Sequence, residues 1–140
     1  MSPAGELLLP LFLHFGLILG LYAALTWARM VTVRRGRVRN DDFSRADGDA
    51  PLSACIQHNL ANQFEAPVFA WIGVLLLIMT GQVLWLDVVA AWVFLFGRLV
   101  HTVVQTTGDR VALRGQVFVI NFLGVLWLMG HAAWAIYRLA

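Results

Sequence analysis

The sequence predicts an all-α membrane protein, an antiparallel bundle of four transmembrane helices formed by a single domain over residues 1–140. Of the 140 residues 60% are hydrophobic and only 13% are charged, a composition that excludes an ordinary soluble domain. Four apolar runs are each long enough to cross a bilayer as a helix. The ten basic residues are all Arg and most of them gather in two of the connections, which is typical of membrane helices with alternating orientation.

The first span is expected over residues 7–28. Its Pro10 falls in the first turns of the helix, where a missing backbone N–H is tolerated. No basic stretch precedes this run, and it is too long for the apolar core of a cleavable signal peptide. We therefore expect it to remain as a membrane helix, followed by a charged loop rich in turn-forming residues.

The second span is expected over residues 53–80. Its second half, VFAWIGVLLLIM, is apolar, whereas its first half, IQHNLANQFEAP, carries many polar side chains. Polar groups in hydrocarbon are costly, so each needs a partner or a function. Pro67 should kink this helix and free the backbone carbonyl of Gln63.

The third and fourth spans are expected over residues 86–106 and 111–138. The short segment GQVLWLD joins the second span to the third and places Trp85 at a membrane interface. Gly97 is expected to let a neighbouring helix approach closely.

The distribution of Arg predicts the orientation in the membrane. The second connection has no basic residue, whereas the first and third have several, so these two should be cytoplasmic and both termini should lie outside. We expect a bacterial inner membrane, with periplasmic termini. The basic residues concerned are Arg34, Arg35, Arg37, Arg39 and Arg45 in the first connection, and Arg110 and Arg114 in the third.

Two helices carry polar residues at helical spacing. They are His58, Asn62 and Glu65 in the second span, and Arg98, His101 and Gln105 in the third. At 1.5 Å per residue, Glu65 and His101 both lie about 22 Å from the outer helix ends, and Asn62 and Gln105 both lie about 27–28 Å from them. We therefore expect these two faces to meet in the cytoplasmic half of the membrane.

Two interpretations of this polar region stay open on spacing alone. In the first, Arg98 and Glu65 form an interhelical ion pair, and Asn62 and His101 add hydrogen bonds between helices. In the second, an Arg-rich recess that opens to the cytoplasm binds a small polyanion, because Arg matches carboxylates in a bidentate manner. Arg110 and Arg114, where the third and fourth spans meet, favour the second.

Two stretches of the sequence resemble a known family. NQFEAP is similar to the Asn-x-x-Glu followed by Pro in the second helix of the MAPEG family, the membrane-associated proteins of eicosanoid and glutathione metabolism. GRLVHTVVQTTGDRVALR resembles that family's third-helix signature, Gly-Arg-x-x-His followed by a basic pair. The resemblance covers nearly the whole chain and suggests a bacterial-type member.

The resemblance implies a homotrimer that binds glutathione, as co-substrate, between neighbouring subunits near the cytoplasmic face. It also implies a glutathione transferase or peroxidase whose thiolate is stabilised by Arg114 as the catalytic residue. The residues expected to bind the tripeptide are Asn62, Glu65 and Arg98, with His101, Gln105, Arg110, His58 and Arg34 beside them.

The chemistry of glutathione fits these residue types. Arg side chains match its carboxylates, and Glu65 matches its ammonium group. A thiol with a pKa near 8.5 is mostly protonated at neutral pH, and a nearby Arg lowers that pKa. The thiolate would attack a lipophilic electrophile dissolved among the membrane lipids. We expect no nucleic-acid partner and no metal site.

The chain differs from the family pattern at two positions, and two other functions are compatible with the same bundle. Gln105 stands where many members have Tyr, and Ala61 where some have Arg. One alternative is a non-catalytic, lipid-binding scaffold with the same bundle. The other is a small four-span proton-coupled exporter that uses Glu65 as its membrane carboxylate, which the density of Arg near the site disfavours.

Overall fold

The structure, a computed structural model, describes residues 3–45, 48–107 and 111–139, except the side chains of Val111 and Arg114. This part of the chain contains helices and no strand. The elements are α1 (Pro3–Arg34), a 3₁₀ helix (Asn40–Ser44), α2 (Pro51–Asn62), α3 (Ala66–Thr80), α4 (Trp85–Thr107) and α5 (Val111–Leu139).

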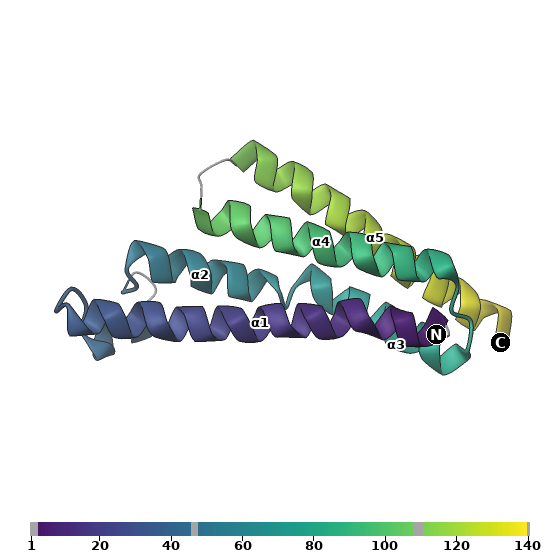
Figure 1. The fold of residues 1–140 in the computed structure, drawn as a ribbon, viewed down its shortest axis with the longest axis horizontal. Coiled ribbons are helices and arrows are strands. Elements are labelled where there is room, and N and C mark those ends of the chain that lie inside the picture. The colour runs from purple at the N-terminus through teal and green to yellow at the C-terminus, as the bar shows by residue number, and fades with distance from the viewer. Residues whose placement is uncertain (1–2, 46–47, 108–110, 140) are drawn as a thin grey trace.

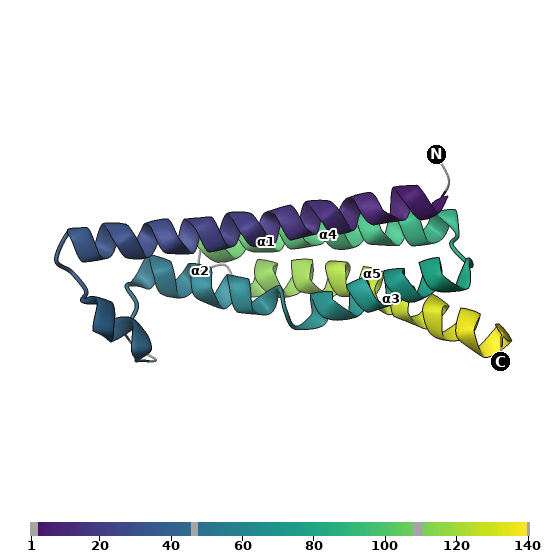
Figure 2. The same cartoon turned by 90° about the horizontal axis from the view of Figure 1, so that it is seen from below.

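The helices form the antiparallel arrangement that the sequence predicts. Helix α1 runs the length of the molecule, α2 and α3 return along it one after the other, and α4 and α5 complete the bundle (Figure 1). Both termini lie at one end, which we call the terminal end, and α1 and α4 finish at the other. Figure 2 shows α1 beside α4 in one layer, with α2 and α3 in the other, and α5 packs on both α3 and α4.

Four helical segments are long and apolar enough to cross a membrane. They are Pro3–Arg34, Pro51–Thr80, Trp85–Thr107 and Gly115–Leu139, with mean hydropathies of 2.1, 1.6, 1.6 and 1.7. Many large apolar side chains on these helices are exposed, as expected of surfaces that face lipid. The chain is therefore an integral membrane protein.

Helix α1 is longer than the span of residues 7–28 predicted from hydropathy. The stretch from Arg29 to Arg34 contains neither Gly nor Pro, so nothing in it ends the helix. The chain turns at Gly36, whose φ of 64° is positive, a conformation that favours glycine. The outer ends of the other three spans lie within two residues of their predicted positions.

Two apolar clusters form the core. The larger joins α1, α3, α4 and α5 and includes Leu11, Val74, Phe94 and Leu128. The smaller joins α1 and α2 away from the terminal end and includes Ile18, Leu21, Leu25, Ile56 and Leu60. Along α1 the two clusters are separated at His14, which is itself fully buried.

Glycines allow α5 to pack closely on its neighbours. A Cβ added at Gly97 of α4 would lie 2.3 Å from the Cβ of Asn121, far inside contact distance. A Cβ added at Gly73 of α3 would lie 3.0 Å from the backbone carbon of Leu128. The expectation that Gly97 permits close helix approach is thus confirmed.

The second membrane span is broken rather than merely kinked. Helix α2 ends at Asn62 and α3 begins at Ala66, and Glu65 between them has φ −93° and ψ −109°, outside the helical region. Pro67 follows at the start of α3, where its missing N–H costs no helical hydrogen bond. The break leaves backbone carbonyls without helical donors in the middle of the span.

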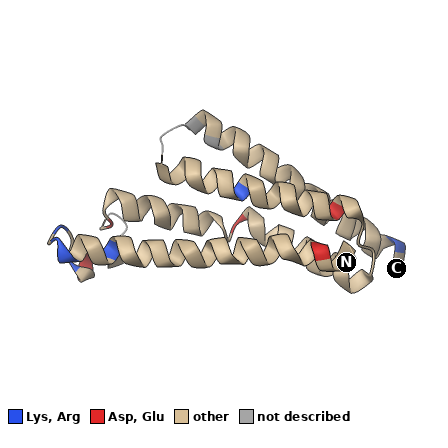
Figure 3. Ribbon diagram, viewed as in Figure 1, with Lys and Arg blue, Asp and Glu red and all other residues tan. Residues whose placement is uncertain are grey.

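The loop before α2 is tied to α1 by a partly buried ion pair. Arg residues gather at the end of the bundle opposite the termini (Figure 3). Arg29 Nε donates to Asp49 Oδ1 at 3.0 Å and a second guanidinium nitrogen bonds Asp49 Oδ2, while Ser53 Oγ donates to Oδ1 at 2.9 Å. Hydrogen bonds from Arg29, opposed by burial and aided by Ser53, lower the pKa of Asp49 below its usual value.

This ion pair should make the stability of the loop depend on pH in the acid range. Because the pKa of Asp49 is lower in the folded chain, the pair stabilises the fold fully above the unfolded value of about 3.9, and its contribution is lost as pH falls from there through the folded pKa. Asp49→Asn should remove that pH dependence. Hydrogen exchange of the loop between about pH 6 and pH 3 would measure it; equal acid sensitivity in wild type and Asp49→Asn would contradict it.

Candidate functional site

A buried network of polar side chains lies beside the break in the second span. We call it the polar hub; its members are His14, Asn59, Gln63, Arg98 and Thr102. Gln63 is at its centre and is 1% exposed. Gln63 Oε1 accepts from Arg98 Nε at 3.1 Å and lies 3.0 Å from His14 Nε2, while its amide nitrogen donates to Asn59 Oδ1 at 2.7 Å.

The hydrogen bonds of the polar hub determine the protonation of His14. Trp71 Nε1 lies 3.0 Å from His14 Nδ1, and an indole nitrogen can only donate. Nδ1 must therefore accept, so the ring proton is on Nε2 and is donated to Gln63 Oε1. His14 is thus a neutral imidazole with both nitrogens engaged in hydrogen bonds.

The other half of the polar hub joins α2 to α4. Asn59 Nδ2 donates to the carbonyl of Thr102 at 3.2 Å, and Thr102 Oγ1 donates to Asn59 Oδ1 at 3.2 Å. Together with His14 from α1 and Trp71 from α3, these contacts connect four helices at one level. Every hub member is buried, so the hub is paired internally, as polar groups within a membrane protein require.

Arg98 is held by the broken helix rather than by an acidic residue. It is 1% exposed, and its Nη2 donates to the carbonyl of Asn62 at 2.9 Å. This carbonyl is one of those that the break leaves without a helical donor. The direct ion pair between Arg98 and Glu65 considered from the sequence is wrong, since these two side chains form no salt bridge among the described residues, although they interact electrostatically.

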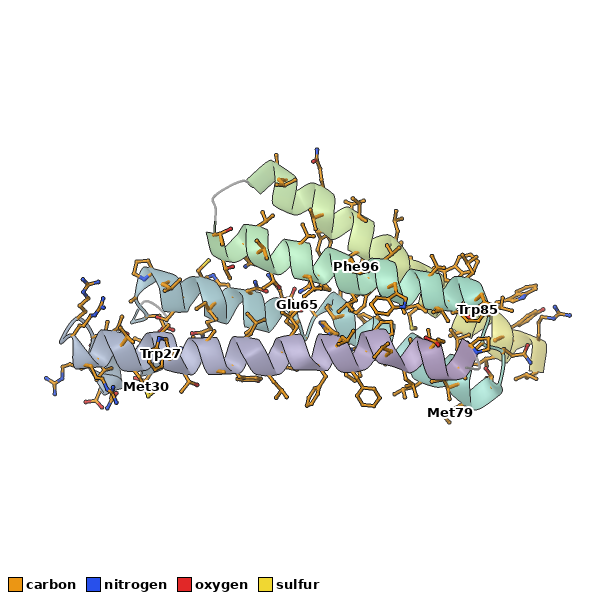
Figure 4. All side chains as sticks on the ribbon, viewed as in Figure 1. Trp27, Met30, Glu65, Met79, Trp85 and Phe96 are labelled. Atoms are coloured by element: carbon orange, nitrogen blue, oxygen red, sulfur yellow. The ribbon has the colours of Figure 1, made fainter. Side chains whose placement is uncertain are left out.

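The other polar residues of the second span lie on the surface. His58 and Glu65 are exposed and Asn62 is partly buried; we call these three the polar patch. Figure 4 shows Glu65 at the break between α2 and α3. The prediction that this whole face turns toward the third span is wrong, because the face that points inward carries Asn59 and Gln63 instead.

One contact does link the polar patch to α4 as the helical rise predicts. Asn62 Nδ2 donates to Gln105 Oε1 at 3.3 Å, which confirms that the two residues lie at the same level. Gln105, His101 and Arg98 share a buried face of α4, with exposures of 8%, 4% and 1%. The His101 ring also packs near Phe118 of α5, at 6.4 Å between ring centroids.

Apolar cavities flank the break on two sides. A groove of about 610 Å³ between α3 and α5 starts at Glu65 and is otherwise lined by apolar side chains, among them Phe64, Phe69, Phe122 and Met129. A cavity of about 290 Å³ against α1 is lined by Phe15, Tyr22, Gln63, Phe64 and Trp71, with other apolar residues. The break therefore places a carboxylate at the edge of a space that suits an apolar molecule.

The basic residues expected at the site are not gathered there by the described part of the chain. Arg34 is exposed at the end of α1, in a separate cavity of about 410 Å³ shared with Arg29 and Phe43. Arg110 lies outside the described residues, and so does the side chain of Arg114, whose backbone is in the first turn of α5. The described residues contain no cluster of three or more potential metal ligands.

A signal in the sequence could have identified the inward face. Ile56, Leu60, Ala70, Val74 and Leu77 follow the heptad spacing of a buried helix face. Gln63 falls in the same phase, so it should be buried, whereas His58 and Glu65 fall opposite it. Trp71 and Thr102 carried no comparable signal, because their roles depend on contacts between helices.

The chain was compared with known proteins. The family model described as MAPEG family matches residues 9–134. No curated protein and no solved structure matches the chain.

Proposed function

Since this chain belongs to the MAPEG family over residues 9–134, we propose that it is a membrane enzyme that uses glutathione to conjugate or reduce lipophilic electrophiles. The site proposed is the polar patch, together with the apolar groove that starts at Glu65. The residues that would bind glutathione are Asn62, Glu65 and His58, with His101, Gln105 and Arg98 behind them and Arg34 and Arg110 from the basic end.

The observation that carries the proposal is the exposed carboxylate of Glu65. It makes no hydrogen bond or salt bridge within the described part of the chain, and although it interacts electrostatically with the buried Arg98, it stays exposed beside an apolar groove in a membrane span. A charge in such a place needs a partner. The ammonium group of glutathione is a partner of the right sign and size.

The buried residues behind the patch would then orient rather than bind. Gln105 fixes the amide of Asn62, and Arg98 fixes its backbone carbonyl. Asn62 can thus present its remaining hydrogen-bonding capacity in one orientation. A direct contact between glutathione and Arg98 would require Arg98 to become accessible.

The proposal includes a homotrimer in which a neighbouring subunit closes the site. The polar patch is open to the surface, and the Arg that lies beside it, Arg98, is buried and already donates to the Asn62 carbonyl, so the carboxylates of glutathione need other basic residues. A neighbour that brings its third connection close, with Arg110, would supply them. The bundle end opposite the termini would face the cytoplasm, since it carries most of the Arg residues.

The reaction needs a stabilised thiolate next to an apolar acceptor. We assign Arg114 to the thiolate, because a fixed positive charge lowers a thiol pKa. The thiolate would form an S–C bond to an acceptor in the apolar groove and displace a leaving group with its electron pair. An apolar acceptor reaches that groove directly from the bilayer.

Turnover and binding measured together test the proposal. The purified protein in detergent should bind glutathione saturably and conjugate it to a generic chloroaromatic acceptor. Arg114→Gln should lower the turnover number by about 10²–10³-fold, the usual effect of removing one group that stabilises developing charge. Arg39→Gln, an exposed Arg in the first connection, is the matched control.

Each outcome has a distinct meaning. Binding with turnover that depends on Arg114 supports the enzyme. Glutathione binding without turnover would identify the non-catalytic scaffold. The reaction would then be missing because Gln105 stands where many members have Tyr. No binding at millimolar glutathione would refute the site itself.

A further inference from the structure

A second polar cavity lies at the terminal end of the bundle, away from the proposed glutathione site. Its volume is about 460 Å³, and its lining includes Gln82, His131, Trp134 and Arg138. We call it the terminal recess. The polar side chains that line it are Gln82, His131 and Arg138, and no acidic residue of the described chain lines it.

A buried carboxylate orients the histidine of the terminal recess. Asp87 in the first turn of α4 is 0% exposed and accepts from the Leu84 backbone N–H at 2.7 Å and from Trp127 Nε1 at 2.9 Å. His131 Nδ1 lies 2.8 Å from Asp87 Oδ1 and 3.0 Å from Oδ2. Since a carboxylate only accepts, Nδ1 carries a proton, and Nε2 is the nitrogen left to face the recess.

Arg138 supplies a cation to the same space. Its side chain is exposed, its Cζ lies 5.9 Å from the centroid of the Trp134 ring, and it makes no hydrogen bond or ion pair with any described residue. Stacking on Trp134 restrains the guanidinium while leaving its N–H groups available. The recess therefore presents donors from Arg138 and Gln82 to an anion, and His131, held by Asp87, borders the same space.

The surroundings indicate which anion. Trp85, Trp134 and Tyr137 at this end are 59%, 56% and 75% exposed, and exposed Trp and Tyr at the ends of membrane helices mark the level of the lipid headgroups. Figure 4 shows Trp85 at the terminal end. Phosphate is the anion of that level, and Arg matches its geometry.

We propose that the terminal recess binds a phosphate group, held by Arg138 and Gln82 beside the Asp87-bound ring of His131. The group belongs either to a phospholipid that lies against this end of the bundle or to a soluble phosphate ester. The site is separate from the polar patch, so it does not depend on the proposed reaction with glutathione.

Native mass spectrometry of the detergent-purified protein tests this site. The probes are dihexanoyl-phosphatidylglycerol, dihexanoylglycerol, which lacks the phosphate, and glycerol 1-phosphate. We expect the phospholipid to bind at least tenfold more tightly than dihexanoylglycerol. Arg138→Gln should remove that preference, whereas the matched charge change Arg39→Gln at the opposite end should not.

The soluble probe identifies the source of the phosphate. If glycerol 1-phosphate binds with the same dependence on Arg138, a soluble ester suffices; if only the phospholipid binds, the ligand is a lipid. Equal binding of the phospholipid and dihexanoylglycerol would overturn the proposal. So would equal losses in Arg138→Gln and Arg39→Gln, because binding would then reflect net charge. Since Arg138 is exposed, its variant tests the site without disturbing the core.

Discussion

Glu65→Gln should weaken glutathione binding by roughly 10- to 150-fold and leave the stability of the protein unchanged. A hydrogen bond to a charged group contributes about 1.5–3 kcal/mol, and each 1.4 kcal/mol corresponds to a factor of ten in affinity. Gln keeps the shape of Glu65 but has no negative charge to pair with the ammonium group. Because Glu65 is exposed and forms no hydrogen bond or salt bridge with a described residue, solvent screening should keep its electrostatic contribution to the fold, through the buried Arg98, small.

Glu6→Gln provides the matched control for this experiment. Glu6 lies in the first turn of α1, at the terminal end, so it reproduces the change in net charge without touching the polar patch. Isothermal titration calorimetry measures the affinity, and thermal unfolding in the same detergent measures stability. A loss of stability in Glu65→Gln comparable to its loss of affinity would mean that Glu65 supports the bundle and does not bind ligand.

Gln63→Leu should destabilise the bundle by about 3 kcal/mol. The substitution removes the acceptor of two buried donors, His14 Nε2 and Arg98 Nε, and each buried group left unpaired costs about 1–3 kcal/mol, more when it is charged. Single hydrogen bonds between membrane helices average only about 0.6 kcal/mol. The expected effect is larger because two donors, one of them a guanidinium, lose a partner at once.

Gln57→Leu separates this effect from the general cost of placing Leu on α2. Gln57 is exposed and accepts a hydrogen bond from Arg29, which keeps its ion pair with Asp49. Its replacement should cost less than about 1 kcal/mol. Unfolding of both variants by a denaturing detergent gives the comparison, and similar losses would show that the polar hub does not stabilise the fold.

The sequence was sufficient for the spans and for the register between α2 and α4. Hydropathy depends on local composition, so it locates the spans. The helical rise is constant, so the sequence alone places Asn62 at the level of Gln105. The buried face of α4 followed from the spacing of Arg98, His101 and Gln105 for the same reason. These features require only the geometry of a single helix and its length.

The direction of the polar residues on α2 could not be read from polarity alone. Two pairs of polar residues could face inward: Asn59 and Gln63, or His58 and Glu65. The charge of the second pair favoured its assignment to the inward face. The apolar residues in phase with Gln63 decide the matter, because their burial outweighs the preference of any single polar group. The His14–Trp71 contact joins residues 57 positions apart, so it depends on the tertiary arrangement.

The interruption at residues 63–65 also has a mechanical consequence. Without continuous helical hydrogen bonds there, α2 and α3 are two separate rigid helices joined by a hinge. The hydrogen bonds of Gln63 hold this hinge in place. If α2 is to rotate relative to α3, Gln63 must first separate from His14 and Arg98. The free-energy cost of the rotation therefore includes the cost of breaking these hydrogen bonds. A ligand bound at Glu65 would lie at this hinge. Its affinity would therefore depend on the hydrogen bonds that hold Gln63 to His14 of α1 and to Arg98 of α4.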